Sequence, residues 1–97
     1  MEYWISHKRM NQEETRIKRV MAMMMTGNGL SLPLTYDRKD IIQSIQKGID
    51  WCTCLQKDET MWTKKAEINV VEVDGEYFIR TDRNIIKSAD LGELLEF

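Results

Sequence analysis

The sequence is poor in the residues that build metal sites, redox centres and membrane spans. It contains one histidine, His7, and two cysteines, Cys52 and Cys54, whereas a structural zinc site requires four ligands. No apolar run in the chain approaches the roughly 20 residues of a membrane helix, and residues 1–4 lack the basic and then apolar order of a signal peptide. We therefore expect no metal or redox chemistry, no membrane association and a cytoplasmic location.

Neither sign of charge is in strong excess. Charged residues make up 31% of the chain, and the net charge at neutral pH is −2, so there is no strong basic excess of the kind that favours nucleic acid. A chain of 97 residues can bury roughly 60–65% of its unfolded surface. We therefore expect a single domain over residues 1–97 that folds without disulfide cross-links.

The two cysteines do not predict a disulfide. Residues two positions apart in a strand point to the same side, so a bridge between Cys52 and Cys54 would be strained. Residues 51–55 are short and rich in strand-forming side chains, which predicts such a strand. The sequence therefore predicts two reduced, partly buried thiols.

The clearest element is a hairpin in "VVEVDGEYFIR", residues 70–80. Asp74-Gly75 between two apolar runs predicts a two-residue type I′ turn, which requires positive φ at both central residues. Such a turn places Val71 opposite Phe78 on one side of the hairpin. The other side carries Ile68, Val70, Tyr77 and Ile79. Because both sides are apolar, the pattern predicts an interior hairpin of a larger sheet.

One helix is predicted from about residue 38 to residue 47. Asp37 can cap its first turn, and Gly48 is a natural C-terminal stop. Isoleucines recur with the spacing of one buried stripe, at Ile41, Ile42, Ile45 and Ile49. This stripe is expected to cover one face of a sheet.

Residues 10–25 fit two interpretations. Ile17, Val20 and Met24 recur at helical spacing, and helix propensity favours a helix. Alternatively, residues 3–9 form a strand, residues 11–14 form a turn, and the chain returns as a second strand over residues 16–23. The pattern leaves both interpretations open.

Three segments resemble a known family. "YWISHKRM" at residues 3–10, "TRIKRV" at residues 15–20 and "VDGEYFIRTDRNIIKSADLGELLEF" at residues 73–97 look like the bacterial domain-of-unknown-function family 3892. The resemblance implies that residues 15–23 form a strand and that the element order is β-β-α-β-β-β. We therefore expect an α+β fold in which an antiparallel sheet of about five strands carries the helix on one face.

The chain departs from the family pattern near its end. Ala89-Asp90-Leu91 stands where the family has Asp-Asn-Leu, and Leu95 stands where the family has proline. The family carries no assigned activity, so the resemblance implies a fold and no function.

The polar end of the hairpin is a candidate ligand site. Its residues are Arg80, Thr81, Arg83 and Asn84. The two arginines can form a fork for phosphate or carboxylate, with the threonine and asparagine as polar helpers. The structural alternative is that Asp82 and Asn84 stabilise a turn, Arg80 pairs with an acid and Arg83 is solvated. We favour this alternative because no glycine-rich phosphate loop accompanies these residues.

The first predicted hairpin is basic. Its cations are Lys8, Arg9, Arg16, Lys18 and Arg19. Basic side chains next to aromatic ones can hold single-stranded nucleic acid, and a charged edge strand that resists aggregation has the same pattern. We favour edge protection because the net charge of the chain is negative.

Methionine is concentrated between residues 21 and 25. On a strand, Met21, Met23 and Met25 share one side with Ile17, whereas Met24 points the other way. One helix can cover only one face of a sheet, so the other face is expected to meet a partner, and methionine suits such a surface because its shape adapts. The predicted interface consists of Trp4, Met21, Met23, Met25, Trp62 and Tyr77.

These patterns predict a small, non-catalytic binding module that acts through protein–protein contacts, with a homodimer as one form of that contact. The second hypothesis is a binder of a phosphate-bearing ligand, either a nucleotide second messenger or nucleic acid, held by the strand-end arginines and the basic first hairpin. Catalysis and a cofactor are not expected. His7 has no recognisable serine or cysteine partner, and no nucleophile elbow, metal motif or dinucleotide fingerprint is present in the sequence.

Overall fold

The structure, a computed structural model, describes residues 2–13, 16–58, 61–92 and 94–97. The predicted turn at 11–14 and the predicted strand start at residue 15 therefore lie partly outside the described residues. No helix in the described part of the chain has the length and apolar character needed to cross a membrane. The elements in chain order are β1 (Glu2–Met10), β2 (Ile17–Thr26), β3 (Gly29–Leu30), β4 (Leu34–Asp37), α1 (Arg38–Gln46), β5 (Asp50–Gln56), β6 (Trp62–Glu67), β7 (Asn69–Val73), β8 (Glu76–Arg80) and β9 (Leu95–Glu96).

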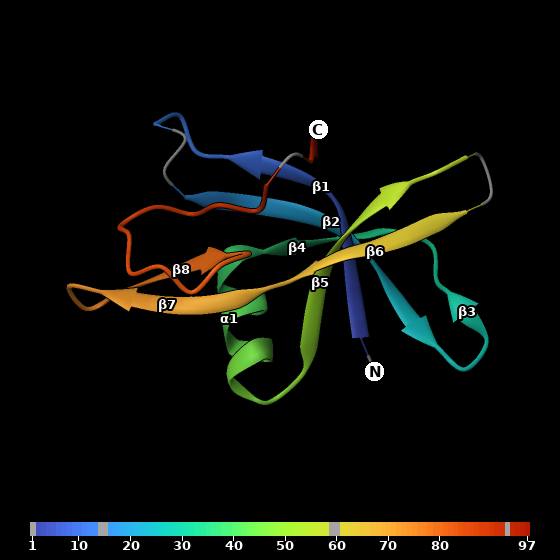
Figure 1. The fold of residues 1–97 in the computed structure, drawn as a ribbon, viewed down its shortest axis with the longest axis horizontal. Coiled ribbons are helices and arrows are strands. Elements are labelled where there is room, and N and C mark those ends of the chain that lie inside the picture. The colour runs from blue at the N-terminus through green and yellow to red at the C-terminus, as the bar shows by residue number, and fades with distance from the viewer. Residues whose placement is uncertain (1, 14–15, 59–60, 93) are drawn as a thin grey trace.

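The α+β class is confirmed, but the main sheet differs from the prediction. It is a curled sheet of seven strands in the order β3-β2-β1-β5-β6, with β4 paired to β2 and β9 paired to β1 (Figure 1). β1 is antiparallel to β2 but parallel to β5 and β9. The prediction of an antiparallel sheet of about five strands is therefore wrong. α1 serves as the crossover that the parallel β1–β5 pair requires. The strands β3, β4, β6 and β9 were not predicted.

The β7–β8 hairpin forms a two-stranded sheet of its own. Its turn is as predicted, with φ of 53° at Asp74 and 79° at Gly75, and Val71 pairs with Phe78. The prediction that it lies inside a larger sheet is wrong. Both of its sides are apolar because one side packs into the main core, while Phe78 on the other side is 1% exposed.

The predicted strand over residues 15–23 is confirmed from residue 17 onward as part of β2, but a register shift changes which side chains share a face. Trp4 pairs with Met23 and His7 with Met21, whereas Ile17 pairs with Met10 beyond a shift between Arg9 and Met10. Such a bulge reverses the alternation of side chains. Ile17 therefore packs in the core, contrary to the prediction that it shares a side with Met21.

The helix is confirmed over Arg38–Gln46, and Gly48 follows it with φ of 89°. Asp37 occupies the N-cap position, but its side chain makes no capping hydrogen bond. Its Oδ1 instead lies 3.1 Å from Nε of Arg19 on β2. The predicted cap is therefore wrong, because Arg19 takes the carboxylate that would have capped the helix.

An aromatic cluster joins α1 to the sheet. The rings of Tyr3 and Trp51 stack with centroids 4.3 Å apart, and Tyr36 meets Trp51 edge-on at 5.4 Å. Trp51 Nε1 donates a hydrogen bond to Ser44 Oγ on α1 at 2.8 Å. α1 and the β7–β8 hairpin together cover one face of the main sheet. The buried core cluster comprises Ile5, Ile17, Val20, Ala22, Ile41, Ile42, Trp51, Ile68, Ile79 and Leu91.

Trp51→Ala is expected to lower the free energy of unfolding by about 3–5 kcal/mol, because it removes a large buried ring and the bond to α1. Urea denaturation measures this loss. Ile85→Ala is the control, because Ile85 is 76% exposed and its truncation should change stability by at most about 0.5 kcal/mol. Equal, small losses in both variants would contradict the packing described.

Candidate functional site

The face of the main sheet opposite α1 contains a groove of about 630 Å³. The β2–β3 and β5–β6 hairpins, which extend to the same side of the molecule in Figure 1, contribute to its walls. Among the described residues that line it, only His7 can carry a charge. We call this surface the methionine face. Its lining residues are Trp4, Ser6, His7, Met21, Met23, Met25, Leu30, Ser31, Leu32, Pro33, Met61 and Trp62.

Strand pairing explains why most of the predicted interface meets in this groove. Met23 lies opposite Trp4, and Met21 lies opposite His7. Trp62 arrives from β6, where it pairs with Gln56 of β5. The predicted interface residues that line the groove are Trp4, Met21, Met23, Met25 and Trp62.

The rim of the groove was not found by sequence reasoning. Leu32 is 85% exposed and Met61 is 53% exposed, whereas Met23 on the floor is 5% exposed. Leu32 belongs to the segment between β3 and β4, and Met61 precedes β6, so neither falls in a strand pattern. Exposed apolar side chains around an apolar groove are typical of a contact surface.

A second cavity, of about 470 Å³, shares Ser6, His7 and Trp62 with the methionine face. His7 Nδ1 lies 2.8 Å from Ser6 Oγ, and Ser6 Oγ donates a hydrogen bond to the carbonyl oxygen of Met21 at 3.2 Å. The Ser6 hydroxyl thus donates to the backbone of β2. Ser6 lies at the irregularity in the β1–β2 pairing between Ile5 and His7.

Both cysteines are free thiols and are 1% exposed. Burial raises the pKa of Cys54 to about 11. Burial, together with the nearby charge of Glu2, raises the pKa of Cys52 to about 12. Because the thiolate is the reactive form of cysteine, these two thiols are poor nucleophiles in the folded chain.

The four predicted ligand residues at the end of the hairpin are distributed over three places. Arg80 and Asn84 both bond to Asp82. Thr81 lines a separate cavity of about 340 Å³. Arg83 lines a cavity of about 510 Å³ next to the C-terminal end of α1. The two arginines therefore point to different surroundings.

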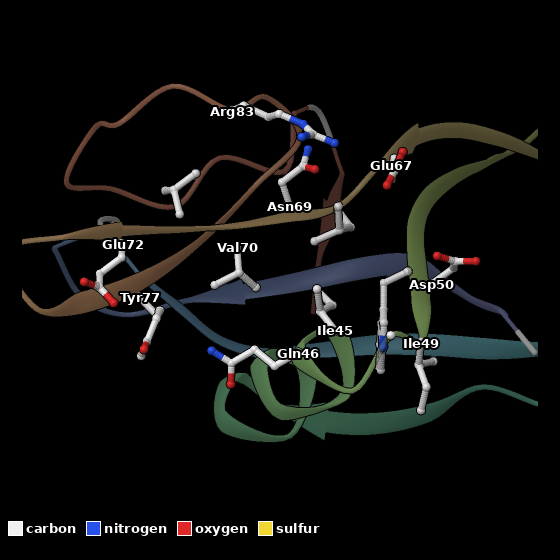
Figure 2. Close-up of a pocket in the computed structure, with 14 residues that line it drawn as sticks. Ile45, Gln46, Ile49, Asp50, Glu67, Asn69, Val70, Glu72, Tyr77 and Arg83 are labelled. Carbon is white, nitrogen blue, oxygen red and sulfur yellow. The ribbon is translucent and has the colours of Figure 1, made fainter.

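The cavity at Arg83 also holds Tyr77, the sixth predicted interface residue (Figure 2). Acidic side chains lie around it at Asp50, Glu67 and Glu72. Arg83 is the only basic side chain among the described residues that line it. A phosphate would meet more negative than positive charge there.

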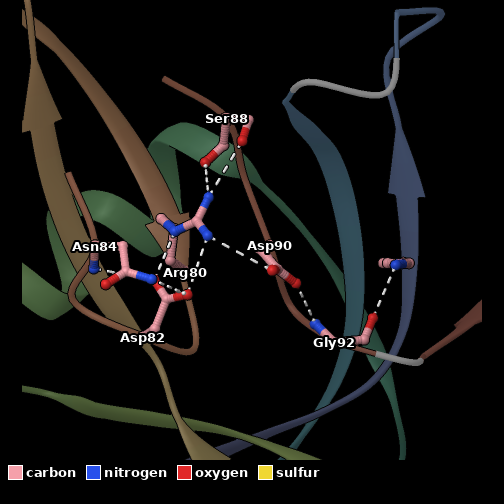
Figure 3. Close-up of polar contacts among 7 residues, drawn as sticks. Arg80, Asp82, Asn84, Ser88, Asp90 and Gly92 are labelled. Atoms are coloured by element: carbon pink, nitrogen blue, oxygen red, sulfur yellow. Dashed lines mark hydrogen bonds and ion pairs between the residues drawn. The ribbon is translucent and has the colours of Figure 1, made fainter. Parts of the chain in front are cut away.

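Arg80 is 4% exposed and is fully engaged with the chain. Its Nε donates to Asp82 Oδ1 at 2.6 Å, and its Nη1 donates to the carbonyl oxygen of Ser88 at 2.8 Å (Figure 3). Its Nη2 donates to Asp82 Oδ2 at 3.0 Å and lies 3.6 Å from Asp90 Oδ2. Asp90 in turn pairs with β8 through backbone bonds to Ile79 and Thr81. These contacts attach the C-terminal segment to β8.

The basic residues of the first hairpin contact other parts of the chain. Lys8 Nζ donates to the carbonyl oxygen of Gly92 at 3.0 Å. Arg9 Nε donates to the carbonyl oxygen of Phe97 at 2.8 Å, and its guanidinium lies 4.6 Å from the centroid of that ring. β1 and β2 each pair with strands on both sides, so the prediction of edge protection is wrong. Part of this positive charge instead anchors the C-terminal segment.

The buried thiols predict resistance to modification. We expect neither Cys52 nor Cys54 to react with Ellman's reagent at pH 8 in the folded chain, because their pKa values of about 12 and about 11 keep them protonated. Both should react in concentrated guanidinium chloride. Rapid reaction of one thiol without denaturant would contradict the burial described.

The Arg80–Asp82 pair predicts a dependence of stability on pH. The hydrogen bond from Arg80 lowers the pKa of Asp82, so the stabilisation is complete above the unfolded value of about 3.9 and is lost as the pH falls through the folded-state pKa. Urea denaturation between about pH 2 and pH 7 should show this loss. Asp82→Asn should lower stability at pH 7 and flatten the acid limb of the profile.

A family model described as "Protein of unknown function (DUF3892)" matches residues 4–95. The matched range covers most of β1, all of the elements from β2 to β8 and the first residue of β9. It therefore includes the groove, the helix and the Arg80 contacts. No curated protein and no solved structure matches the chain. The chain therefore belongs to this family of proteins of unknown function, as the segments at residues 3–10, 15–20 and 73–97 predicted.

Proposed function

We propose that the chain is a non-catalytic protein-interaction module that forms a homodimer through the methionine face. One observation carries the proposal. Trp4, three methionines and Trp62 converge on a mostly apolar groove, while α1 and the β7–β8 hairpin occupy the opposite face of the same sheet. Apolar surface left open in this way is stabilised when another surface covers it.

A second copy of the chain suits this surface better than a charged partner does. A two-fold interface brings the same patch of both copies together, so the patch must be complementary to itself. Among the described lining residues only His7 can be charged, so two such faces approach with little repulsion between like charges. The face also offers both a protruding side chain, Leu32 at 85% exposure, and a groove beside it.

The contacts near the groove support binding rather than catalysis. Ser6 gives its proton to a backbone carbonyl, and Cys54 is protonated with a pKa of about 11. Neither residue is an activated nucleophile, so the site offers shape and apolar area in place of reactive groups.

Sedimentation equilibrium over a range of protein concentrations tests the proposal. We expect a mass approaching twice the 11.5 kDa of the chain. Met25→Glu and Leu32→Glu should each weaken self-association at least about tenfold, which corresponds to about 1.4 kcal/mol, because each buries an unpaired carboxylate.

Ile85→Glu is the matched control, since Ile85 is apolar and 76% exposed but does not line the groove. It should associate as the unmodified chain does. If the chain is a monomer at all concentrations up to about 1 mM, the free energy of dimerisation is weaker than about 4 kcal/mol and the proposal is refuted. Equal weakening by Ile85→Glu and Met25→Glu would place the contact elsewhere.

A further inference from the structure

A second groove, separate from the methionine face, lies between α1 and the tip of the β7–β8 hairpin. Its volume is about 630 Å³, which lies within the range of about 300–1,000 Å³ for small-molecule sites. The two grooves share no lining residue. An inference about this groove is therefore independent of the proposed homodimer.

Positive charge collects at one end of this groove. Arg16, Arg38 and Lys39 line it, and Glu76 is the one acid among its described lining residues. Arg38 and Lys39 are the first two residues of α1, where the aligned peptide dipoles add to the attraction for an anion. Asp37 does not cap this end with its side chain, and Asp40 in the first turn does not line the groove. The end of the groove is therefore suited to an anion.

The cations are held in place by the surrounding chain. Arg38 Nη1 donates a hydrogen bond to the carbonyl oxygen of Tyr77 at 3.2 Å, and Arg16 bonds to the carboxylate of Glu76. The pKa of Glu76 is lowered, chiefly by that hydrogen bond and further by the charges of Arg16, Lys87 and Arg38. These cations act on the position held by the Glu76 carboxylate, so a phosphate in the groove would share their attraction with that carboxylate.

The rest of the groove is suited to a planar group. Tyr77, a residue that is 40% exposed, supplies an aromatic ring, and Ile42 adds an apolar contact. Gln43 and Gln46 follow on the same side of α1, and their amides can both donate and accept hydrogen bonds. An aromatic ring with polar edges can stack on the tyrosine while these amides bond to its edge.

We propose that this groove binds a small phosphate-bearing molecule with a planar ring, of the nucleoside monophosphate class. The phosphate lies between Arg38, Lys39 and Arg16, and the ring lies along Tyr77. The acidic cavity of Figure 2 begins beyond Gln46 and Tyr77, which line both spaces. That negative charge directs the phosphate to the N-terminal end of α1 and repels the continuing backbone of a polynucleotide.

Isothermal titration calorimetry on the full chain at low ionic strength tests this site. The probes are adenosine and guanosine 5′-monophosphate, adenosine, inorganic phosphate and a single-stranded oligonucleotide. We expect at least one of the two nucleotides to bind about tenfold more tightly than adenosine or phosphate alone, because it uses both halves of the groove. Binding should weaken as salt is added.

Four variants locate the ligand. Lys39→Gln should weaken nucleotide binding about tenfold, whereas Lys47→Gln, which changes a lysine just beyond the other end of α1, should not. Tyr77→Leu should weaken nucleotide but not phosphate binding. Glu76→Gln should strengthen both, because it removes the competing carboxylate. Circular dichroism checks that each variant is folded.

The proposal is overturned if neither nucleotide binds saturably, or if Lys39→Gln and Lys47→Gln behave alike. Tighter binding of the oligonucleotide than of either mononucleotide would replace the small ligand with nucleic acid. Met25 lies on the other face, so Met25→Glu should leave nucleotide binding unchanged. Calorimetry and sedimentation therefore test the nucleotide site and the homodimer independently.

Discussion

The packing of α1 and the β7–β8 hairpin on one face of the curled sheet is the constraint on which the rest of the structure depends. Trp51 joins the two layers, since its ring stacks on Tyr3 and its Nε1 bonds to Ser44 of α1. The nine-residue helix α1 and the β7–β8 hairpin both pack on this face. The opposite face of the sheet, the methionine face, is left without a covering element among the described residues. Its mostly apolar lining consists largely of strand side chains that alternate with those of the core.

The parts of the fold that follow from local chemistry could be predicted. Asp74-Gly75 predicted the hairpin turn because few residues adopt positive φ, and the isoleucine stripe predicted α1. The parallel pairing of β5 with β1 depends on where the crossover returns, which no local pattern records. β6 was missed because its two central lysines, Lys64 and Lys65, hide its alternation.

For the candidate sites too, local patterns could be predicted from the sequence and long-range contacts could not. The side shared by Met21, Met23 and Met25 followed from a period of two, but the bulge that moves Ile17 into the core depends on pairing with β1. The strand-end arginines looked like a fork because they are three apart in sequence. Whether they converge depends on the path of the C-terminal segment, which takes Arg80 inward. The groove at Arg38 and Tyr77 joins segments distant in sequence, so no motif reveals it.

The most direct test of the central claim observes the methionine methyl groups themselves. In spectra of the chain labelled with ¹³C at the methionine methyls, a soluble paramagnetic agent broadens the methyls that solvent reaches. If the methionine face is covered by a second copy, broadening of Met21 and Met25 will decrease as protein concentration rises, while that of Met24 on the other side stays constant. Broadening of Met21 and Met25 that is the same at every concentration would contradict the account.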